Sequence, residues 1–529
     1  MSQTSAATPA RTEVPHRLDD GPAPKLLGLG DQVSLWANLG ISLLVLVSAA
    51  FVLAPDPALP PLAPAAALTA VLVGALIGNA LLGLAAVPGA ETGAPSMVLL
   101  RGLLGVVDQA ALWANLGISL LVLVSAAFVL VPDPALPPLA PVAALTAVLV
   151  GSLLGNALLG LAAVPGEQTG APAMVLLRGL LGVRGSWVPT VLNVVQLVGW
   201  TTFEIVVIAQ VAASLTSPGL RVPFVLAGGL LATLMAIRPL GVVRGYLKRV
   251  ALWAVLASTA YLFVQVLRHP LPPLAAGSWS GFWKGVDIVV ALGVSWVPLA
   301  ADYSRHSRSV GAAFWGAFNG YTLGAGSFFV LGVLANLAYA PPADDSFAVI
   351  GALLAVPAGA LALLILVIDE LDEAFADLYS TVVSLQNLRP SLDRRVLGLG
   401  LGLLCTVLAL VLDVVAYQSF LLLIGSVFVP LFATFAIDYF VLRRGAWDTS
   451  SAARGRWLML LPWAAGFVAY QLVNPGLVGP WARLWTGVQH ALGFSPPAWA
   501  SASLVSLVVA ALVALAVGWP ARSRAAAQP

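Results

Sequence analysis

The stretch LALLILVIDELDEAFADLYSTVVSLQNL, residues 361–388, decides the fold class. It is long and apolar enough to cross a bilayer, which takes about 20 residues of α-helix. Five carboxylates interrupt it, namely Asp369, Glu370, Asp372, Glu373 and Asp377. An ionisable group at membrane depth costs at least about 2.5 kcal/mol on insertion scales, so such a helix must lie inside a bundle of other membrane helices.

The placement of these carboxylates around the helix indicates a cavity. At 100° per residue they span an arc of roughly 160°, and all except Asp372 lie within about 100°. The alternative is a solvated helix end, but the apolar pattern resumes at Ala374 and Phe375 and the next basic residue is Arg389. We therefore expect the carboxylates to face a cavity, where they could take up protons or hold a cation.

The whole chain has the composition of a membrane protein. Of its 529 residues 60% are hydrophobic and 9% charged, and the mean hydropathy is +0.96, whereas soluble domains are about 25% charged. No segment between the apolar runs is long enough for a soluble domain. Fourteen helices are predicted, near 33–54, 65–87, 110–131, 142–164, 187–214, 222–238, 246–267, 282–301, 311–338, 347–388 (with a short extra helix possible at its start), 394–415, 417–442, 456–474 and 500–519.

The basic residues predict the orientation. With the N-terminus inside, 21 of the 25 Lys and Arg residues face the cytoplasm and only Arg221, Arg268, Lys284 and Arg483 face outward. We therefore expect a multi-pass inner (cytoplasmic) membrane protein with both termini cytoplasmic.

The basic residues are scattered along the chain, which argues against a nucleic-acid partner. The one cysteine, Cys405, excludes a disulfide within the chain. Membrane lipid and a small solute are the expected partners of a monomer.

A direct repeat fills the first third of the chain. Residues 31–106 match residues 108–183 at an offset of 77 with nine differences. Transporter repeats are weak and often inverted, so this is a recent copy of two helices. The expected organisation is a cytoplasmic tail at 1–30, an extra two-helix unit at 31–107, a twelve-helix core at 108–520 and a second tail at 521–529.

Two further places carry polar groups at membrane depth. In the run 187–214, Asn193, Gln196, Trp200 and Glu204 follow one another at spacings of 3, 4 and 4 and form one helical stripe. An indole ring beside amide and carboxylate groups suits a planar heteroaromatic ligand, which can stack while its edge forms hydrogen bonds. Hydrogen bonding between helices explains the stripe equally well.

The second place has residues that interrupt helices. Gly293 and Pro298 flank Ser295 and Trp296 and predict an unwound stretch, which is tolerated only where it lines a cavity. Broken helices mark the substrate and ion sites of transporters. The segment Asn115-Leu-Gly117-Ile-Ser119 is a weaker case, for which a packing face of small residues is an equal alternative.

From residue 108 to about 520 these residues resemble the nucleobase:cation symporter-1 family, the purine and cytosine permeases. The motifs are Gly170-Ala-Pro-Ala-Met-Val-Leu-Leu-Arg178, Gly182-Val-Arg-Gly185, Gly199-Trp200, Ala301-Asp-Tyr-Ser-Arg305, Val427-Phe-Val-Pro-Leu-Phe432 and Asp438-Tyr-Phe440. The segment from Asp369 to Pro390 is similar to the bacterial cytosine or hydroxymethylpyrimidine permeases. The resemblance implies a LeuT-type fold of twelve helices with a five-plus-five inverted repeat.

The resemblance also implies roles for particular residues. The family's stacking tryptophan falls on Trp200, its following amide, usually Gln, on Glu204, and the last Asn of its substrate motif on Asp377. A hydroxyl pair that helps to hold sodium falls on Leu371 and Asp372. Since neither residue carries the family's hydroxyl group, a proton is the simpler coupling ion. The expected ion is therefore H+ or Na+.

A symporter that imports a nucleobase-like heterocycle such as cytosine, hydroxymethylpyrimidine or a purine is therefore the expected function, with a LeuT-type transporter of allantoin, hydantoin or an amino acid as the alternative. An enzyme is not expected, because the four histidines lie outside the predicted spans. No catalytic residue, metal or cofactor beyond the coupling ion is predicted. The expected substrate-binding residues are Trp200, Glu204, Gln196, Asn115, Gly117, Ser119, Gly293, Ser295, Trp296 and Asp377, and the expected cation-coupling residues are Asp369, Asp372 and Glu373.

Overall fold

A computed structural model describes residues 104–237, 241–342, 347–389, 391–412, 417–497 and 499–526. Within these ranges the chain is helical, with two isolated bridges and no strand. The extra helices expected in residues 31–107 fall almost wholly outside them. The main helices are α5 (Val106–Gly117), α6 (Leu120–Leu130), α7 (Pro141–Thr169), α8 (Ala173–Gly185), α9 (Trp187–Leu215), α10 (Arg221–Ile237), α11 (Gly241–Leu267), α12 (Phe282–Ser295), α13 (Ala300–Ser304), α14 (Val310–Tyr339), α15 (Ala348–Leu354), α16 (Gly359–Leu388), α17 (Arg394–Val411), α18 (Tyr417–Ala436), α19 (Leu460–Val473), α20 (Gly479–Ala491) and α21 (Ala502–Ala526).

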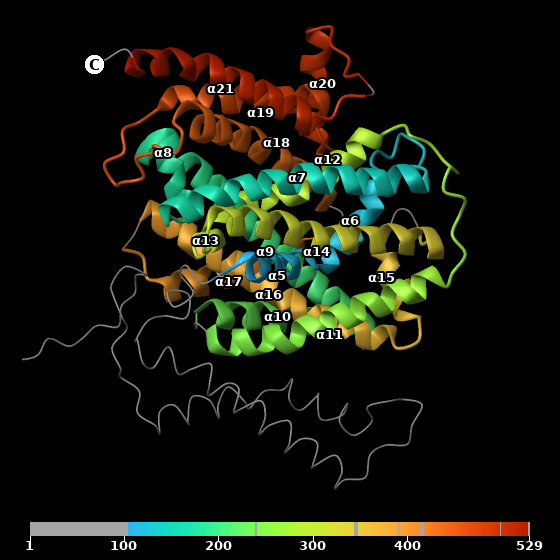
Figure 1. Ribbon diagram of the computed structural model, residues 1–529. Helices are drawn as coiled ribbons and strands as arrows, with labels where there is room; N and C mark the ends of the chain where they lie inside the picture. The colour runs from blue at the N-terminus through green and yellow to red at the C-terminus, as the bar shows by residue number, and fades with distance from the viewer. Residues whose placement is uncertain are drawn as a thin grey trace, which may run out of the picture. The chain divides into compact units, whose positions relative to one another are not determined.

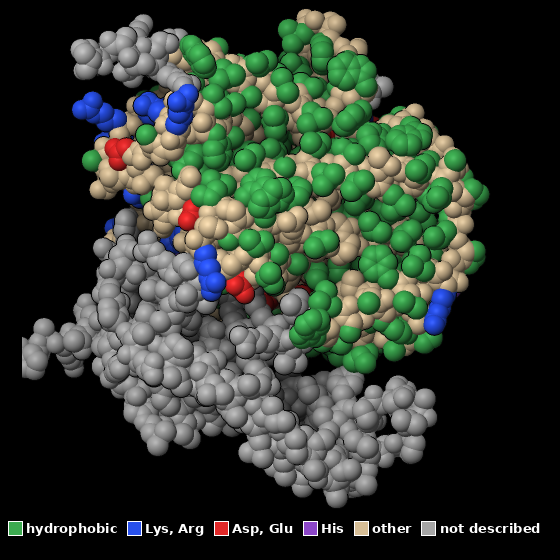
Figure 2. Space-filling model, in the orientation of Figure 1, with side chains coloured by type: hydrophobic (Ala, Val, Ile, Leu, Met, Phe, Trp, Pro, Cys, Tyr) green, Lys and Arg blue, Asp and Glu red, His purple; other side chains and the backbone are tan. Residues whose placement is uncertain are grey.

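The described helices have the length and surface of membrane spans. Eight of them are long and apolar enough to cross a bilayer, and the bent pair α5 and α6 makes a ninth. The acid-bearing α16 is 30 residues long but carries too many charged residues to meet the same criterion. Hydrophobic side chains are spread over the whole of the described surface in Figure 2, and the few Lys and Arg side chains lie near its edges. The described part of the chain is thus a multi-pass membrane bundle.

Small residues allow the close packing of this bundle. In the described residues α14 packs along α5, α6 and α7 (Figure 1). A Cβ atom added to Gly117 would lie 2.6 Å from the backbone nitrogen of Ala325, and one added to Gly324 would lie 2.2 Å from the carbonyl oxygen of Ala114. Membrane helices approach this closely where glycines meet. Gly117 therefore packs closely against α14, as the packing alternative predicts. It also lies at a break between two helices.

Several predicted boundaries differ from the structure. The run 110–131, expected as one helix, is two helices bent by 65° at Ile118 and Ser119. The predicted helices leave out α20, which lies between residues 474 and 500. That helix is amphipathic, so a search for continuous apolar runs does not detect it. The short helix considered before the acid-bearing span is α15.

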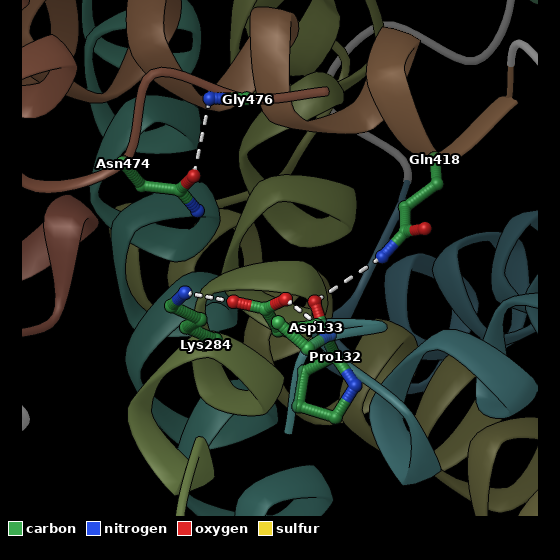
Figure 3. A network of polar contacts seen from close by, with 7 residues as sticks. Pro132, Asp133, Lys284, Gln418, Asn474 and Gly476 are labelled. Carbon is green, nitrogen blue, oxygen red and sulfur yellow. Dashed lines mark hydrogen bonds and ion pairs between the residues drawn. The ribbon is translucent and has the colours of Figure 1, made fainter. Parts of the chain in front are cut away.

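A polar network ties loop residues to α12 and α18 at one end of the bundle (Figure 3). Lys284 on α12 donates to Asp133 at 2.5 Å, and Gln418 on α18 donates to the carbonyl oxygen of Pro132. Burial raises the pKa of Asp133, but the hydrogen bonds from Lys284 and the Ala135 N–H outweigh it, so this pKa lies below its ordinary value. The network fixes the connection between α6 and α7.

Candidate functional site

A narrow cavity lies where α6, α9, α12, α14 and α16 meet. Its lining combines aromatic rings, carboxylates and hydroxyls. The residues are Ser119, Leu121, Val122, Trp200, Glu204, Leu292, Ser295, Trp296, Tyr321, Glu373 and Asp377. Six of the ten residues predicted to bind substrate therefore border one space, namely Ser119, Trp200, Glu204, Ser295, Trp296 and Asp377. Glu373, one of the three residues predicted to couple the cation, borders it too.

The break between α5 and α6 places a helix N-terminus at this cavity. Ser119 is the N-cap of α6, and its hydroxyl accepts from the N–H of Leu121. The carboxylate of Glu370 on α16 accepts from the Ser119 hydroxyl at 2.8 Å and from the backbone N–H of Leu120 at 2.9 Å. The Leu121 N–H donates to it at 3.4 Å. A carboxylate is favoured at this position, because a helix N-terminus carries unpaired N–H groups and partial positive charge.

Three buried carboxylates converge beside this helix end. One oxygen each of Glu204, Glu370 and Glu373 lies within 4.8 Å of the others. Among the described residues, Glu204 Oε2 and Glu373 Oε1 have no hydrogen-bond partner, and both residues are at most 4% exposed. Carboxylate oxygens at these distances could hold a cation, or share protons that reduce their repulsion.

Aromatic rings enclose the same space from two sides. Trp200 on α9 forms edge-to-face contacts with Tyr417 and Phe420, with ring centroids 5.9 and 5.3 Å apart. Trp296, which follows α12, lies 6.0 Å from Trp113 and 6.1 Å from Tyr321. These contacts fix the orientation of both indoles while leaving part of each at the cavity. Rings held in this way can stack on a flat ligand without losing further freedom.

The polar stripe on α9 has two functions along its length. Trp200 and Glu204 line the cavity. Gln196 instead donates 3.0 Å bonds to Asn193 Oδ1 and to the carbonyl oxygen of Ser295, and Asn193 donates to Ser384 on α16. Hydrogen bonding between helices therefore explains the first half of the stripe, and ligand binding stays a prediction for the half that lines the cavity.

The second interrupted segment is less broken than the sequence suggested. The α-helix ends at Ser295, a 3₁₀ turn runs over Val297–Leu299, and α13 follows in the same span. The carbonyl oxygen of Ser295 is satisfied by Gln196. Gly293 packs against α7, where an added Cβ would lie 2.6 Å from Asn156 Oδ1.

Other predicted residues lie near the cavity without lining it. Asn115 and Gly117 are buried at the end of α5, and Asp369 is buried on α16. Asp372 is half-buried on α16 and is not one of the carboxylate trio. The predicted set omitted Glu370 and Tyr321. Glu370 was visible as one of the four carboxylates on a shared arc, but nothing in the sequence indicated that it would meet Ser119.

A broken helix beside an acid-bearing helix, around a buried polar cavity in a membrane bundle, is the arrangement of a membrane transporter. The family model for permeases for cytosine/purines, uracil, thiamine and allantoin matches residues 134–454, more than half of the chain. The chain belongs to this permease family.

Solved structures share the fold. The inward-facing conformation of Mhp1 aligns with a TM-score of 0.60 and 17% identity over 80% of this chain and 93% of that chain. Mhp1, a nucleobase-cation-symport-1 family transporter, closed with bromovinylhydantoin bound, aligns with a TM-score of 0.58 and 16% identity over 80% and 93%. A manganese transporter from Eremococcus coleocola gives 0.50 and 13% over 78% and 95%. No curated protein sequence matches significantly. The expected all-α, LeuT-type membrane fold is confirmed.

Proposed function

We propose that the chain is a symporter that imports a nucleobase-like heterocycle, such as cytosine, hydroxymethylpyrimidine or a purine, together with a cation. The observation that carries this proposal is the cavity in which the Trp200 indole lies beside the carboxylates of Glu204 and Asp377. Flat rings stack on indoles, and ring N–H groups donate to carboxylates. Membership of the permease family supports the same solute class.

The coupling cation is a proton or sodium ion. Glu373 is buried, lines the cavity and has an unpartnered oxygen within the described structure, so it is the first candidate to bind the ion. Asp369 and Asp372 on the same helix remain further candidates. The proposed transport cycle needs no permanently bound metal ion and no catalysed reaction.

The proposed setting is the inner membrane, with both termini cytoplasmic and the protein a monomer in lipid. The distribution of Lys and Arg supports this orientation. We further propose that residues 108–520 form the working core and that the second repeat copy supplies the Asn115–Ser119 break. The second copy alone continues directly into α9.

Uptake into proteoliposomes tests the proposal. The purified full chain should accumulate radiolabelled cytosine or a purine above equilibrium when a pH or sodium gradient is imposed, and an ionophore that collapses the gradient should abolish accumulation. Allantoin, hydantoin and an amino acid serve as alternative solutes. Uptake of none of the heterocycles under either gradient would contradict the proposed function.

A further inference from the structure

Helix α20 lies apart from the cavity and outside residues 134–454, which the family model matches. It connects α19 to α21 and runs across the direction of both helices (Figure 1). Its 13 residues make a rod about 20 Å long, whereas the hydrocarbon core of a bilayer is about 30 Å thick. The helix is therefore too short to be a span and lies at the end of the bundle where α19 ends and α21 begins.

One face of α20 is fixed to α19. The Trp481 indole N–H donates to Gln471 Oε1 at 2.9 Å, and the Gln489 side-chain amide donates to the carbonyl oxygen of Leu472 at 2.9 Å. The ring of Trp481 also lies 6.3 Å from that of Phe467. Because these contacts come from both ends of α20, they set its rotation, and its other faces keep a constant direction.

The exposed surface of α20 has an apolar and a polar side. Leu484 is 56% exposed, and the flanking Leu477 and Leu492 are 44% and 64% exposed. Arg483 and His490, which are also exposed, lie about 20° from each other around the helix and about 100–120° from Leu484. Figure 2 shows hydrophobic side chains over the part of the surface where Figure 1 places α20. In water the leucines would stay hydrated, which is unfavourable.

The surroundings of α20 indicate what covers this apolar side. The next helix, α21, is long and apolar enough to cross a bilayer, and it exposes Val508 and Leu512. The leucines of α20 therefore continue a surface that already faces lipid. A short helix with an apolar side, a basic polar side and tryptophan residues is suited to the boundary between headgroups and acyl chains.

We infer that α20 is an interfacial anchor, a helix that lies in the plane of the membrane and binds the phospholipid layer at that end of the bundle. Leu477, Leu484 and Leu492 contact the acyl chains just below the headgroups. Arg483 and His490 face the headgroups and water, where the long arginine side chain reaches phosphate oxygens. The inference concerns a surface away from the cavity and does not depend on which solute is carried.

Spin labels on single cysteines test the inference in the full chain. Cys405 is the one cysteine and is buried, so Cys405→Ala provides the background. Labels replace Leu484 and Arg483, with Leu403 on α17 as the lipid-facing reference and Asp448 as the exposed-loop reference. The protein is reconstituted into phosphatidylethanolamine and phosphatidylglycerol vesicles. Electron paramagnetic resonance then compares collisions with O2, which concentrates in lipid, and with a water-soluble nickel chelate present on both sides.

We expect the ratio of O2 to nickel collisions at Leu484→Cys to be about fivefold above that at Arg483→Cys, and to lie between the values of the two references. Leu477→Cys reports on the same side if Leu484→Cys does not insert. A ratio at the leucine positions equal to that at Asp448→Cys would overturn the inference, because it would place this side in water. Protection from both reagents would overturn it too, because protein, such as a second copy of the chain, would then cover the leucines.

Discussion

The two interrupted segments at the cavity expose backbone groups of opposite polarity. The break before α6 frees N–H groups, and the Glu370 carboxylate accepts from them. The end of α12 frees the Ser295 carbonyl oxygen, and the Gln196 amide donates to it. Each free group thus meets a side chain of complementary polarity, as the helix dipole favours.

The difference between them lies in charge and in geometry. The first break bends by 65° and uses an ionisable partner from α16, whereas the second continues through a 3₁₀ turn and uses a neutral partner from α9. Helices α9 and α16 pack against each other. A change in protonation or ion binding on α16 can therefore alter the first break directly, while the second is held by a group that does not titrate.

The largest effect is expected when Glu370 is removed. Glu370→Ala would leave a buried hydroxyl and the N–H groups of α6 without their acceptor, each costing about 1–3 kcal/mol. We expect transport to be lost and the thermal unfolding temperature in detergent to fall, with Glu370→Gln intermediate because it keeps an acceptor oxygen. Wild-type uptake and stability in Glu370→Ala would show that this contact does not hold the break.

Gly117→Leu tests the same break and has an internal control in the first repeat copy. A Cβ atom at Gly117 would meet the backbone of Ala325, and overpacking of this kind costs about 1–3 kcal/mol or more. We expect uptake to be lost in Gly117→Leu and kept in Gly40→Leu, the same change in the first repeat copy.

Deletion of residues 31–107 complements these point changes and should also preserve uptake. The opposite pattern, in which Gly40→Leu abolishes uptake and Gly117→Leu does not, would show that the first copy supplies the working helix.

A smaller effect is expected at the neutral break. Gln196→Leu removes donors to the Ser295 carbonyl oxygen and to Asn193, at about 1–2 kcal/mol. We expect slower uptake with the ion dependence unchanged. Gln210→Leu, later on the same helix and only partly buried, is the control. If Gln196→Leu changes the ion dependence as strongly as a substitution on α16 does, the neutral break also takes part in ion coupling. That result would contradict the proposed difference between the two breaks.

In coupling variants the effect is expected on uphill accumulation alone. Glu373→Gln should spare exchange of solute but abolish uphill accumulation, because it removes a buried ionisable group at the cavity. Asp372→Asn should act in the same direction but less, since Asp372 is half-buried. Exchange and concentrative uptake are compared in the same proteoliposomes. Concentrative uptake at the wild-type level would remove the residue concerned from the coupling site.

Sequence patterns predicted the helices and much of the cavity for identifiable reasons. Hydropathy marks membrane spans because lipid excludes unpaired polar groups, and a shared arc placed Glu373 and Asp377 on one side of α16. The pairing of Glu370 with Ser119 could not be predicted, because it joins residues 251 apart in the chain. The bend at Ile118 was underestimated for the same reason, since the N–H groups of Leu120 and Leu121, which follow the bend, donate to that distant carboxylate.

Equilibrium binding of radiolabelled cytosine to purified protein tests most directly whether the cavity between the two breaks is the solute site. We predict that Trp200→Ala and Glu204→Ala each weaken binding by about 1–3 kcal/mol, roughly tenfold to hundredfold, because each removes a stacking or hydrogen-bonding partner. Asp448→Asn should bind as the wild type does. Unchanged affinity in both cavity variants would contradict the assignment of this cavity as the solute site.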